Sequence, residues 1–416
     1  MKKHLWIFAA AAAALAACSN DDTIAVNQGY DDASAISFRV LTTGMTRAVD
    51  QTSSTLQTNG FYVTANKSGD GTEYFGGKTA TETLNAAIHY TWNSTGTNAN
   101  SYTTENKYYW PSEGDLDFIA YAPAAATSSD IVRTDTISFT VSPASTPAEQ
   151  KDLVFAVTRN QNKTANGAVV ILNFRQAESN VAILLKNTNN NLKFTVGTAT
   201  IGNLKGTETF TWNGVTDGTT TTAKAAASTT GNYEGTGTLT YLNGTWTATS
   251  AATTAYTTPT ATNSTLNGTT DAQALGATAT NYDMILIPQA YTTTNAYASA
   301  SENAGFNGAY IKVQLKIQNK ANDAYIAGGD GENSWQEAIW PLTPIMSGET
   351  NIGWLPGHKY TYTVDLAGGG YYPTNKAGTD EKLDPILDGA EIKFVTVTVD
   401  AWPTTATNTD IANANN

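Results

Sequence analysis

The segment GAVVILNFRQAESNVAILLKN, residues 167–187, contains two short apolar runs that are separated by a polar stretch. Runs of this length, rich in Val and Ile and bounded by polar residues, are typical of β-strands. No stretch of the chain sustains the helical period of about 3.6 residues. The sequence therefore predicts an all-β protein with few, short helices. Similar segments recur on both sides: AISFRVLT (35–42), GFYVTA (60–65), LDFIAYAP (116–123), DTISFTVSP (135–143), KDLVFAVT (151–158), LKFTVGTATIG (192–202), YDMILIPQ (282–289), AYIKVQLKIQN (309–319), HKYTYTVDL (358–366) and AEIKFVTVTVDAW (390–402).

Length and composition favour two domains of the same kind. Hydrophobic residues make up 40% of the 416 residues, whereas charged residues make up 14%. The surface is instead rich in Thr, Asn, Gly and Ser, which favour strands and turns. We expect two tandem β-sandwiches of the transthyretin-like or Greek-key type. The N-terminal sandwich is expected over 48–175 and the C-terminal one over 176–402, with a Thr-rich insertion at about 216–276 and a polar tail at 403–416.

The first residues resemble an export signal. A basic start precedes an apolar run, Leu5–Ala17, which as a helix of roughly 20 Å is too short to span a bilayer. Residues 1–17 are therefore expected to be a signal peptide. Cys18, the single cysteine, follows Leu-Ala-Ala, which resembles the bacterial lipoprotein signal, and Ser19–Asp22 resembles a signal for surface lipoproteins. We expect lipidation of Cys18 and a place on the cell outer membrane; the alternative is a plain signal peptide cut near Ala17.

The sequence offers no constellation of catalytic or metal-binding residues. The net charge of −13 argues against nucleic acid, whose phosphates would be repelled. His89 and His358 stand without a metal-ligand or catalytic motif. The loop AGGDGENSW (327–335) contains Asp330 and Glu332, but it lacks the acidic spacing of a calcium loop. We expect no enzyme activity, no metal and no cofactor.

Five segments stand out for what they share with a known family: KYYWPSEGDLDFIAYAP (107–123), KDLVFAVT (151–158), VVILNFRQAESNVAILLKN (169–187), WLPGHKYTYTVDL (354–366) and IKFVTVTVDAW (392–402). Together they resemble the fimbrillins, which are subunits of the type V pili of the Bacteroidales. One departure is Gln176, which stands where members of that family often have His. The resemblance implies an exported two-sandwich lipoprotein that is cut by an arginine-specific or trypsin-like protease and polymerises by strand exchange, in the service of cell adhesion.

One arginine suits such a cut. Arg47 lies in the polar stretch TTGMTRAVDQTSST, and exposed stretches of small residues are preferred by proteases. Cleavage between Arg47 and Ala48 would release residues 18–47, a lipidated propeptide that includes the strand 35–42. Arg159, in VTRNQNK, is the main competing site. The alternative for Arg47 is an ordinary solvated side chain.

Loss of that strand would uncover a groove. Ile36, Phe38 and Val40 alternate along it and are expected to fill the first sandwich. At about 1.5–3 kcal/mol for each buried side chain, their removal costs roughly 5–9 kcal/mol. We expect the groove to take a strand from another fimbrial subunit, which gives a head-to-tail polymer and places the processed protein in the fimbrium.

The donor strand is less clear. The tail after Trp402 offers Ile411 and a few alanines as apolar side chains. The candidate donor strand is therefore the one with Val395, Val397 and Val399, which alternate correctly. A role as stalk, tip or anchor stays open. The alternative function is a tethered lipoprotein that binds glycans through exposed aromatic side chains and does not polymerise.

Overall fold

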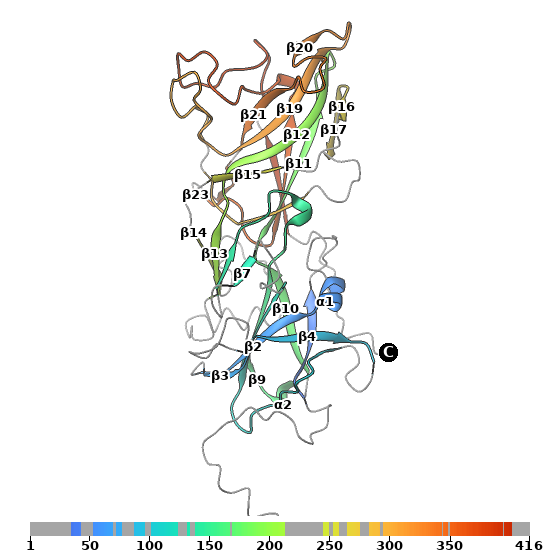
Figure 1. The fold of residues 1–416 in the computed structure, drawn as a ribbon, viewed down its shortest axis with the longest axis vertical. Helices are drawn as coiled ribbons and strands as arrows, with labels where there is room; N and C mark the ends of the chain where they lie inside the picture. The colour runs from blue at the N-terminus through green and yellow to red at the C-terminus, as the bar shows by residue number, and fades with distance from the viewer. Residues whose placement is uncertain are drawn as a thin grey trace, which may run out of the picture.

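The protein is elongated, with two strand-rich parts arranged end to end (Figure 1). The fold described here is that of a computed structural model. It describes residues 35–42, 53–69, 72–76, 87–95, 101–123, 131–133, 138–166, 169–212, 244–248, 253–257, 264–274, 283–291, 294–342, 344–347, 350–393 and 395–401.

The N-terminal part is an eight-stranded sheet in the order β3-β2-β4-β5-β1-β10-β9-β6, and β2 also pairs with β6. All of these strands except β3 therefore form a closed ring, whose interior is one hydrophobic core. Helix α1, Ser53–Asn59, packs beside β1 and β4. The strands are β1 (Ser37–Thr42), β2 (Phe61–Lys67), β3 (Glu73–Phe75), β4 (Ile88–Asn93), β5 (Ser101–Thr103), β6 (Leu116–Ala122), β9 (Val154–Gln161) and β10 (Val169–Gln176).

The C-terminal part is a sandwich of two sheets. One has the order β17-β11-β24-β25, with β18 beside β11; the other has the order β15-β12-β19-β20, with β16 beside β12 and β21 beside β19. The strands are β11 (Ser179–Asn187), β17 (Thr269–Ala274), β18 (Met284–Leu286), β24 (His358–Asp365), β25 (Thr396–Ala401), β12 (Leu192–Lys205), β15 (Thr253–Thr257), β16 (Ser264–Leu266), β19 (Tyr310–Asn319), β20 (Tyr325–Ala327) and β21 (Gln336–Pro341).

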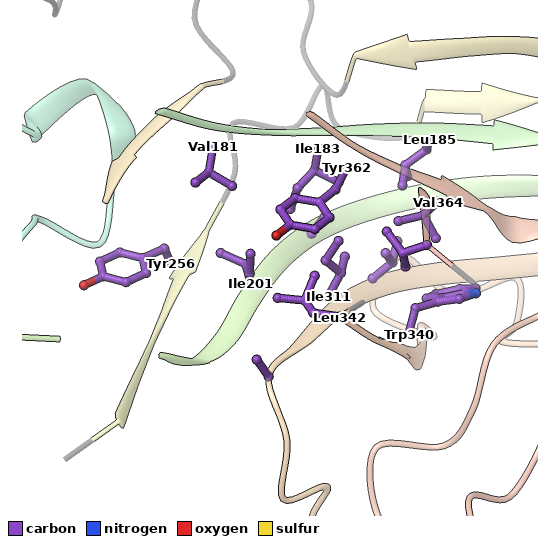
Figure 2. Packing of buried hydrophobic residues seen from close by; sticks show 14 of the residues in the cluster. Val181, Ile183, Leu185, Ile201, Tyr256, Ile311, Trp340, Leu342, Tyr362 and Val364 are labelled. Atoms are coloured by element: carbon purple, nitrogen blue, oxygen red, sulfur yellow. The ribbon is translucent and has the colours of Figure 1, made fainter. Parts of the chain in front are cut away.

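Alternation along the strands builds the core between these two sheets. In β19, YIKVQLKIQN, Ile311, Val313 and Leu315 point inward and are fully buried, while the Lys and Gln residues between them are mostly half-buried. Figure 2 shows Ile311 packed with Tyr362 of β24 and with side chains of β11. A separate hairpin is formed by β22 (Met346–Ser347) and β23 (Thr350–Asn351).

A third, smaller sheet connects the two parts and is called the joining sheet here. It has the order β14-β13-β8-β7. Strand β8 (Ser138–Val141), which precedes the predicted domain boundary at 175/176, therefore pairs with β13 (Glu208–Trp212), which follows it. Its other strands are β7 (Ile131–Arg133) and β14 (Gly244–Ala248). β14 to β17 begin within the predicted Thr-rich insertion. The predicted domain limits stay a prediction, because the joining sheet belongs to both parts.

The all-β prediction is confirmed, including the small share of helix. Beside α1, the described helices are α2, Lys163–Asn166, and two 3₁₀ turns, Pro147–Glu149 and Leu366–Gly368. Within the described residues, no helix is long and apolar enough to cross a membrane. The predicted signal peptide and polar tail lie outside the described residues.

Candidate assembly site

Strand β1 is one of the strands that form the closed ring, and it lies between β10 and β5. Its residues Ser37–Thr42 run parallel to Val169–Phe174 of β10, and Phe38 stands opposite Tyr102 of the antiparallel β5. Strand β10 pairs with β9 only through Arg175 and Gln176, farther along. Strand β1 is thus the described strand partner of most of β10. The residue before the strand is held too, because the Ile36 N–H donates to the Tyr108 carbonyl at 2.7 Å.

The three side chains predicted to fill the first part point into its core. Ile36 is 2% exposed, and Phe38 and Val40 are fully buried. All three belong to the cluster inside the ring, together with Phe174 at the end of β10. The alternation of apolar residues in this segment therefore corresponds to one inward face. Whether the strand can be removed stays a prediction.

Phe38 lies at the centre of an aromatic cluster. Its ring centroid is 4.7 Å from that of Tyr90, 5.2 Å from that of Phe118 and 6.2 Å from that of Phe61, each edge-on. Phe61 also contacts Tyr102, with 4.6 Å between the centroids. Edge-to-face pairs add about 0.5–1.5 kcal/mol each beyond simple burial. The site therefore selects a large aromatic side chain at this position.

Two tyrosine hydroxyl groups lie buried near Phe38. Neither the Tyr90 nor the Tyr102 hydroxyl has a hydrogen-bond partner among the described residues. Burial, with a smaller contribution from Tyr108, raises the pKa of Tyr90 well above its ordinary value, and burial alone raises the pKa of Tyr102. Both groups are therefore neutral at physiological pH, and the pocket around Phe38 carries no charge from them.

The opposite face of β1 is also restricted. Ser37 alternates with Ile36 and Phe38 and points away from the ring interior, yet it is only 1% exposed. Ser37 is therefore covered by the surrounding structure. A long charged side chain at this position would lose its contact with water.

The predicted lipidation and cleavage residues, Cys18, Arg47 and Ala48, lie outside the described residues. The other four arginines all fall in paired strands: Arg39 in β1, Arg133 in β7, Arg159 in β9 and Arg175 in β10. A protease needs an accessible, extended stretch of chain, so paired strands are poor substrates. The competing site, Arg159, is half-buried in a central strand of the ring.

The candidate donor strand is β25, which among the described strands pairs only with β24 and lies at the edge of its sheet. Its three valines have different surroundings. Val395, just before the strand, is 2% exposed and belongs to the core of the sandwich, Val397 packs partly against that core, and Val399 is 43% exposed. The candidate donor thus already contributes to its own domain.

The other residues considered from the sequence have structural roles. The His89 ring stacks on Tyr62 with 4.8 Å between centroids, and its Nε2 lies 2.9 Å from the Asn59 carbonyl. His358 Nδ1 lies 2.8 Å from the Pro356 carbonyl. Across the described ranges, no group of three or more His, Cys, Asp or Glu residues is placed to hold a metal ion, and the loop with Asp330 and Glu332 is exposed.

The described tryptophans do not form an exposed platform for a sugar. Trp340 and Trp354 are buried. Trp335 is half-buried and lies under Lys316, whose Nζ is 4.8 Å from the ring centroid. Within the described part of the chain, the exposed large hydrophobic residues are Tyr325, Ile326 and Val399.

The joining sheet contains residues that the sequence did not single out. Phe210 of β13 packs against Phe155 of the ring at 5.1 Å and against Trp246 of β14 at 5.2 Å. Trp246 Nε1 donates to the Ala177 carbonyl at 3.0 Å. These contacts fix the first part of the molecule to the second. Trp246 is the one tryptophan of the Thr-rich tract at 216–276, and a tryptophan in so polar a tract was the available signal.

The fold and this site define an all-β protein of two joined parts, in which a strand from the N-terminal end completes the core of the first part. A sequence model of the fimbrillin-like family matches residues 46–402. The chain therefore belongs to the fimbrillin-like family, and the resemblance seen in the sequence is confirmed. The family is named for fimbrial proteins, which agrees with the expectation of a non-enzyme.

One solved structure of a fimbrial protein shares the fold, and two others were found with lower TM-scores. A fimbrial protein from Bacteroides vulgatus is 16% identical with a TM-score of 0.50, covering 88% of this chain and 99% of its own. A candidate cell adhesion protein from Bacteroides uniformis is 18% identical, with a TM-score of 0.39 and coverage of 89% and 99%. The fimbrial anchor protein Mfa2 from Porphyromonas gingivalis is 8% identical, with a TM-score of 0.27 and coverage of 79% and 90%. No curated protein matches the chain.

Proposed function

We propose that this protein is a structural subunit of surface fimbriae that joins its neighbours by protease-triggered strand exchange and serves cell adhesion. In this proposal Cys18 carries the lipid that anchors the unprocessed protein in the cell outer membrane. Cleavage between Arg47 and Ala48 then releases the anchor together with β1, and a strand from another subunit takes the place of β1. The observation that carries the proposal is the position of β1. This strand is paired on both sides within the closed ring, yet it precedes Arg47 in the chain.

The energetic cost of losing β1 supports this mechanism. Three buried side chains at about 1.5–3 kcal/mol each amount to roughly 5–9 kcal/mol, before the hydrogen bonds to β10 are counted. A typical domain is stable by about 5–15 kcal/mol in total. A ring without its first strand is therefore a strong acceptor for an added strand, and main-chain pairing with alternate side-chain pockets is an established mode of strand addition.

The distribution of arginines supports Arg47 as the cleavage site. The remaining four arginines are held in paired strands, so an arginine-specific or trypsin-like protease has poor access to them. The family match begins at residue 46, after β1 ends at Thr42. Strand β1 itself thus lies before the part of the chain that matches the family.

Digestion of the protein with an arginine-specific protease, followed by N-terminal sequencing and mass measurement of the products, tests the proposal. The wild type should yield a new N-terminus at Ala48, and β1 should separate from the ring under mild denaturant. Arg47→Ala should resist this cut, and the matched control Arg159→Ala should behave like the wild type. An N-terminus that stays intact while the chain is cut elsewhere would contradict the proposal.

A further inference from the structure

We infer that the groove left by β1 is shaped for a strand from a different subunit and not for a strand from a second copy of this chain. The inference rests on the proposed function, because it concerns the partner that enters the same site. It follows from two side-chain positions of β1, Phe38 and Ser37, whose surroundings set opposite requirements for size.

The first requirement is an aromatic side chain in the centre of the donor strand. The rings of Tyr90, Phe118 and Phe61 surround Phe38 edge-on. A smaller residue at this position leaves a cavity among these rings, because they belong to strands that are fixed in the ring by their own pairing. Apolar residues two positions before and after must replace Ile36 and Val40, which are equally buried.

The second requirement is a small residue immediately before the aromatic one. Ser37 is 1% exposed although it faces away from the ring interior. The donor strand must therefore have a small side chain here, since a long charged side chain would be cut off from water. The required pattern is apolar, small, aromatic, any residue, apolar.

The C-terminal strand of this chain fails this test in the two registers that bring Val397 or Phe394 to the Phe38 position. If Val397 takes the place of Phe38, Thr396 suits the Ser37 position, but a valine leaves the aromatic cluster underfilled. A shift that brings Phe394 to the Phe38 position exchanges the two faces of the strand and brings Lys393 to the buried Ser37 position. Phe394 itself is outside the described residues. The tail 403–416 contains a single large apolar residue, Ile411, and cannot supply the pattern.

The first register carries a further cost to the donor. Val395 is buried in the core of the C-terminal sandwich and Val397 packs against it. To donate this strand, the subunit would have to uncover its own core. A second copy of the chain therefore loses contacts in the donor and gains an imperfect fit in the acceptor.

Elsewhere in the chain the pattern is met by residues 137–141 and 360–364, which lie mostly in paired strands, and the first of these segments serves as a probe. Residues 137–141 read Ile-Ser-Phe-Thr-Val, beside Ile-Ser-Phe-Arg-Val at 36–40. In the intact protein most of this segment is β8, which is held between β7 and β13 in the joining sheet. It is unavailable as a donor, but as a synthetic peptide it tests the pattern apart from the β1 sequence.

The experiment uses the full protein after cleavage by an arginine-specific protease and removal of the released β1 peptide. A fluorescent peptide of residues 35–42 is bound to the vacated groove, and unlabelled peptides compete in an anisotropy assay. The peptide 136–142 should compete within about threefold of the unlabelled 35–42 peptide. The Phe38→Val and Ser37→Lys forms of the 35–42 peptide, and the peptide 393–401, should each be weaker by about tenfold or more.

The outcomes separate this inference from the proposed function. Failure of β1 to leave after cleavage would overturn both. Release of β1 and binding of the 35–42 peptide, with equally strong binding of 393–401 or of the Phe38→Val form, would overturn the inference and leave the proposed function intact. Light scattering gives a second readout: the cleaved protein alone should stay monomeric, and polymers of this subunit alone would also overturn the inference.

Discussion

The strands at the two ends of the described chain, β1 and β25, have similar sequences and opposite positions. Both alternate apolar residues with others, as SFRVLT and TVTVDA. Strand β1 is a strand of the closed ring and has a paired strand on each side, whereas β25 is the outermost described strand of its sheet. Phe38 is fully buried, but Val399 is 43% exposed. The position of a strand in the sheet, more than its alternation, decides how strongly the domain depends on it.

This difference divides the molecule into an N-terminal part whose first strand is paired on both sides and a C-terminal part whose last strand lies at a sheet edge. Strand β1 contributes three side chains to the ring core and pairs with most of β10. The sandwich core is built mainly from β11, β12, β19 and β24, which are paired on both sides. A subunit that exchanges strands needs such an asymmetry, because the acceptor domain must be incomplete after cleavage while the rest stays folded.

The largest expected effect is that of Phe38→Ala. Removal of the ring from the centre of the aromatic cluster should lower the free energy of unfolding of the N-terminal part by about 3–5 kcal/mol. Urea denaturation followed by tryptophan fluorescence measures this loss. Phe38→Leu, which keeps most of the apolar volume, is the matched control and should lose clearly less. A loss below about 1 kcal/mol for the alanine variant would show that β1 contributes little to the ring.

A smaller effect is expected within the candidate donor strand, where Val395→Ala and Val399→Ala form a matched pair. Val395 is buried in the sandwich core, so its truncation should cost about 2 kcal/mol. Val399 is exposed at the sheet edge, so its truncation should change stability by less than about 0.5 kcal/mol. Thermal unfolding of the two variants gives both values. Equal losses would mean that the edge of β25 is covered and would remove the contrast with β1.

Part of this contrast could be predicted from the sequence. The alternation of Ile36, Phe38 and Val40 indicated a buried face, and the structure places that face in a core. The sequence could not show that β1 runs parallel to β10, because the pairing joins segments more than a hundred residues apart. Nor could it distinguish Val395 from Val399, since both alternate in the same pattern and only the sheet edge separates them.

The joining sheet could not be predicted from the sequence, for a related reason. β13 lies before the polar, Thr-rich tract and β14 lies within it, and the pairing of β13 with β8 joins distant segments. Phe210 of β13 belongs to the hydrophobic cluster beside this sheet, and Trp246 of β14 packs against it. Local alternation predicts that strands exist, whereas the assignment of each strand to a sheet depends on packing that no local pattern encodes.

The smallest expected effect is a loss of stability of the C-terminal sandwich at acidic pH, near the segment that leads into β25. Asp365, at the end of β24, accepts hydrogen bonds from Thr188 Oγ1 at 2.6 Å and from the Thr188 N–H at 3.1 Å, and Lys393 Nζ lies 3.4 Å away. Burial disfavours its ionised form, but these hydrogen bonds and the lysine outweigh burial and lower the pKa of Asp365. Because the folded-state pKa is lowered, the stabilisation is complete above the unfolded value of about 3.9 and is lost as the pH falls below it.

Asp365→Asn should therefore destabilise the C-terminal sandwich by on the order of 1 kcal/mol at neutral pH and make no difference at strongly acidic pH. Thermal unfolding between neutral pH and about pH 3 measures the convergence of variant and wild type. Asp388→Asn, at an exposed position, is the matched control and should follow the wild type throughout. The N-terminal part should show no response to Asp365→Asn, because the carboxylate bridges β24, the turn after β11 and Lys393 within the sandwich. If the difference in stability between variant and wild type is the same at all pH values, the asparagine acts through packing. The charge of Asp365 would then not stabilise the segment that leads into β25.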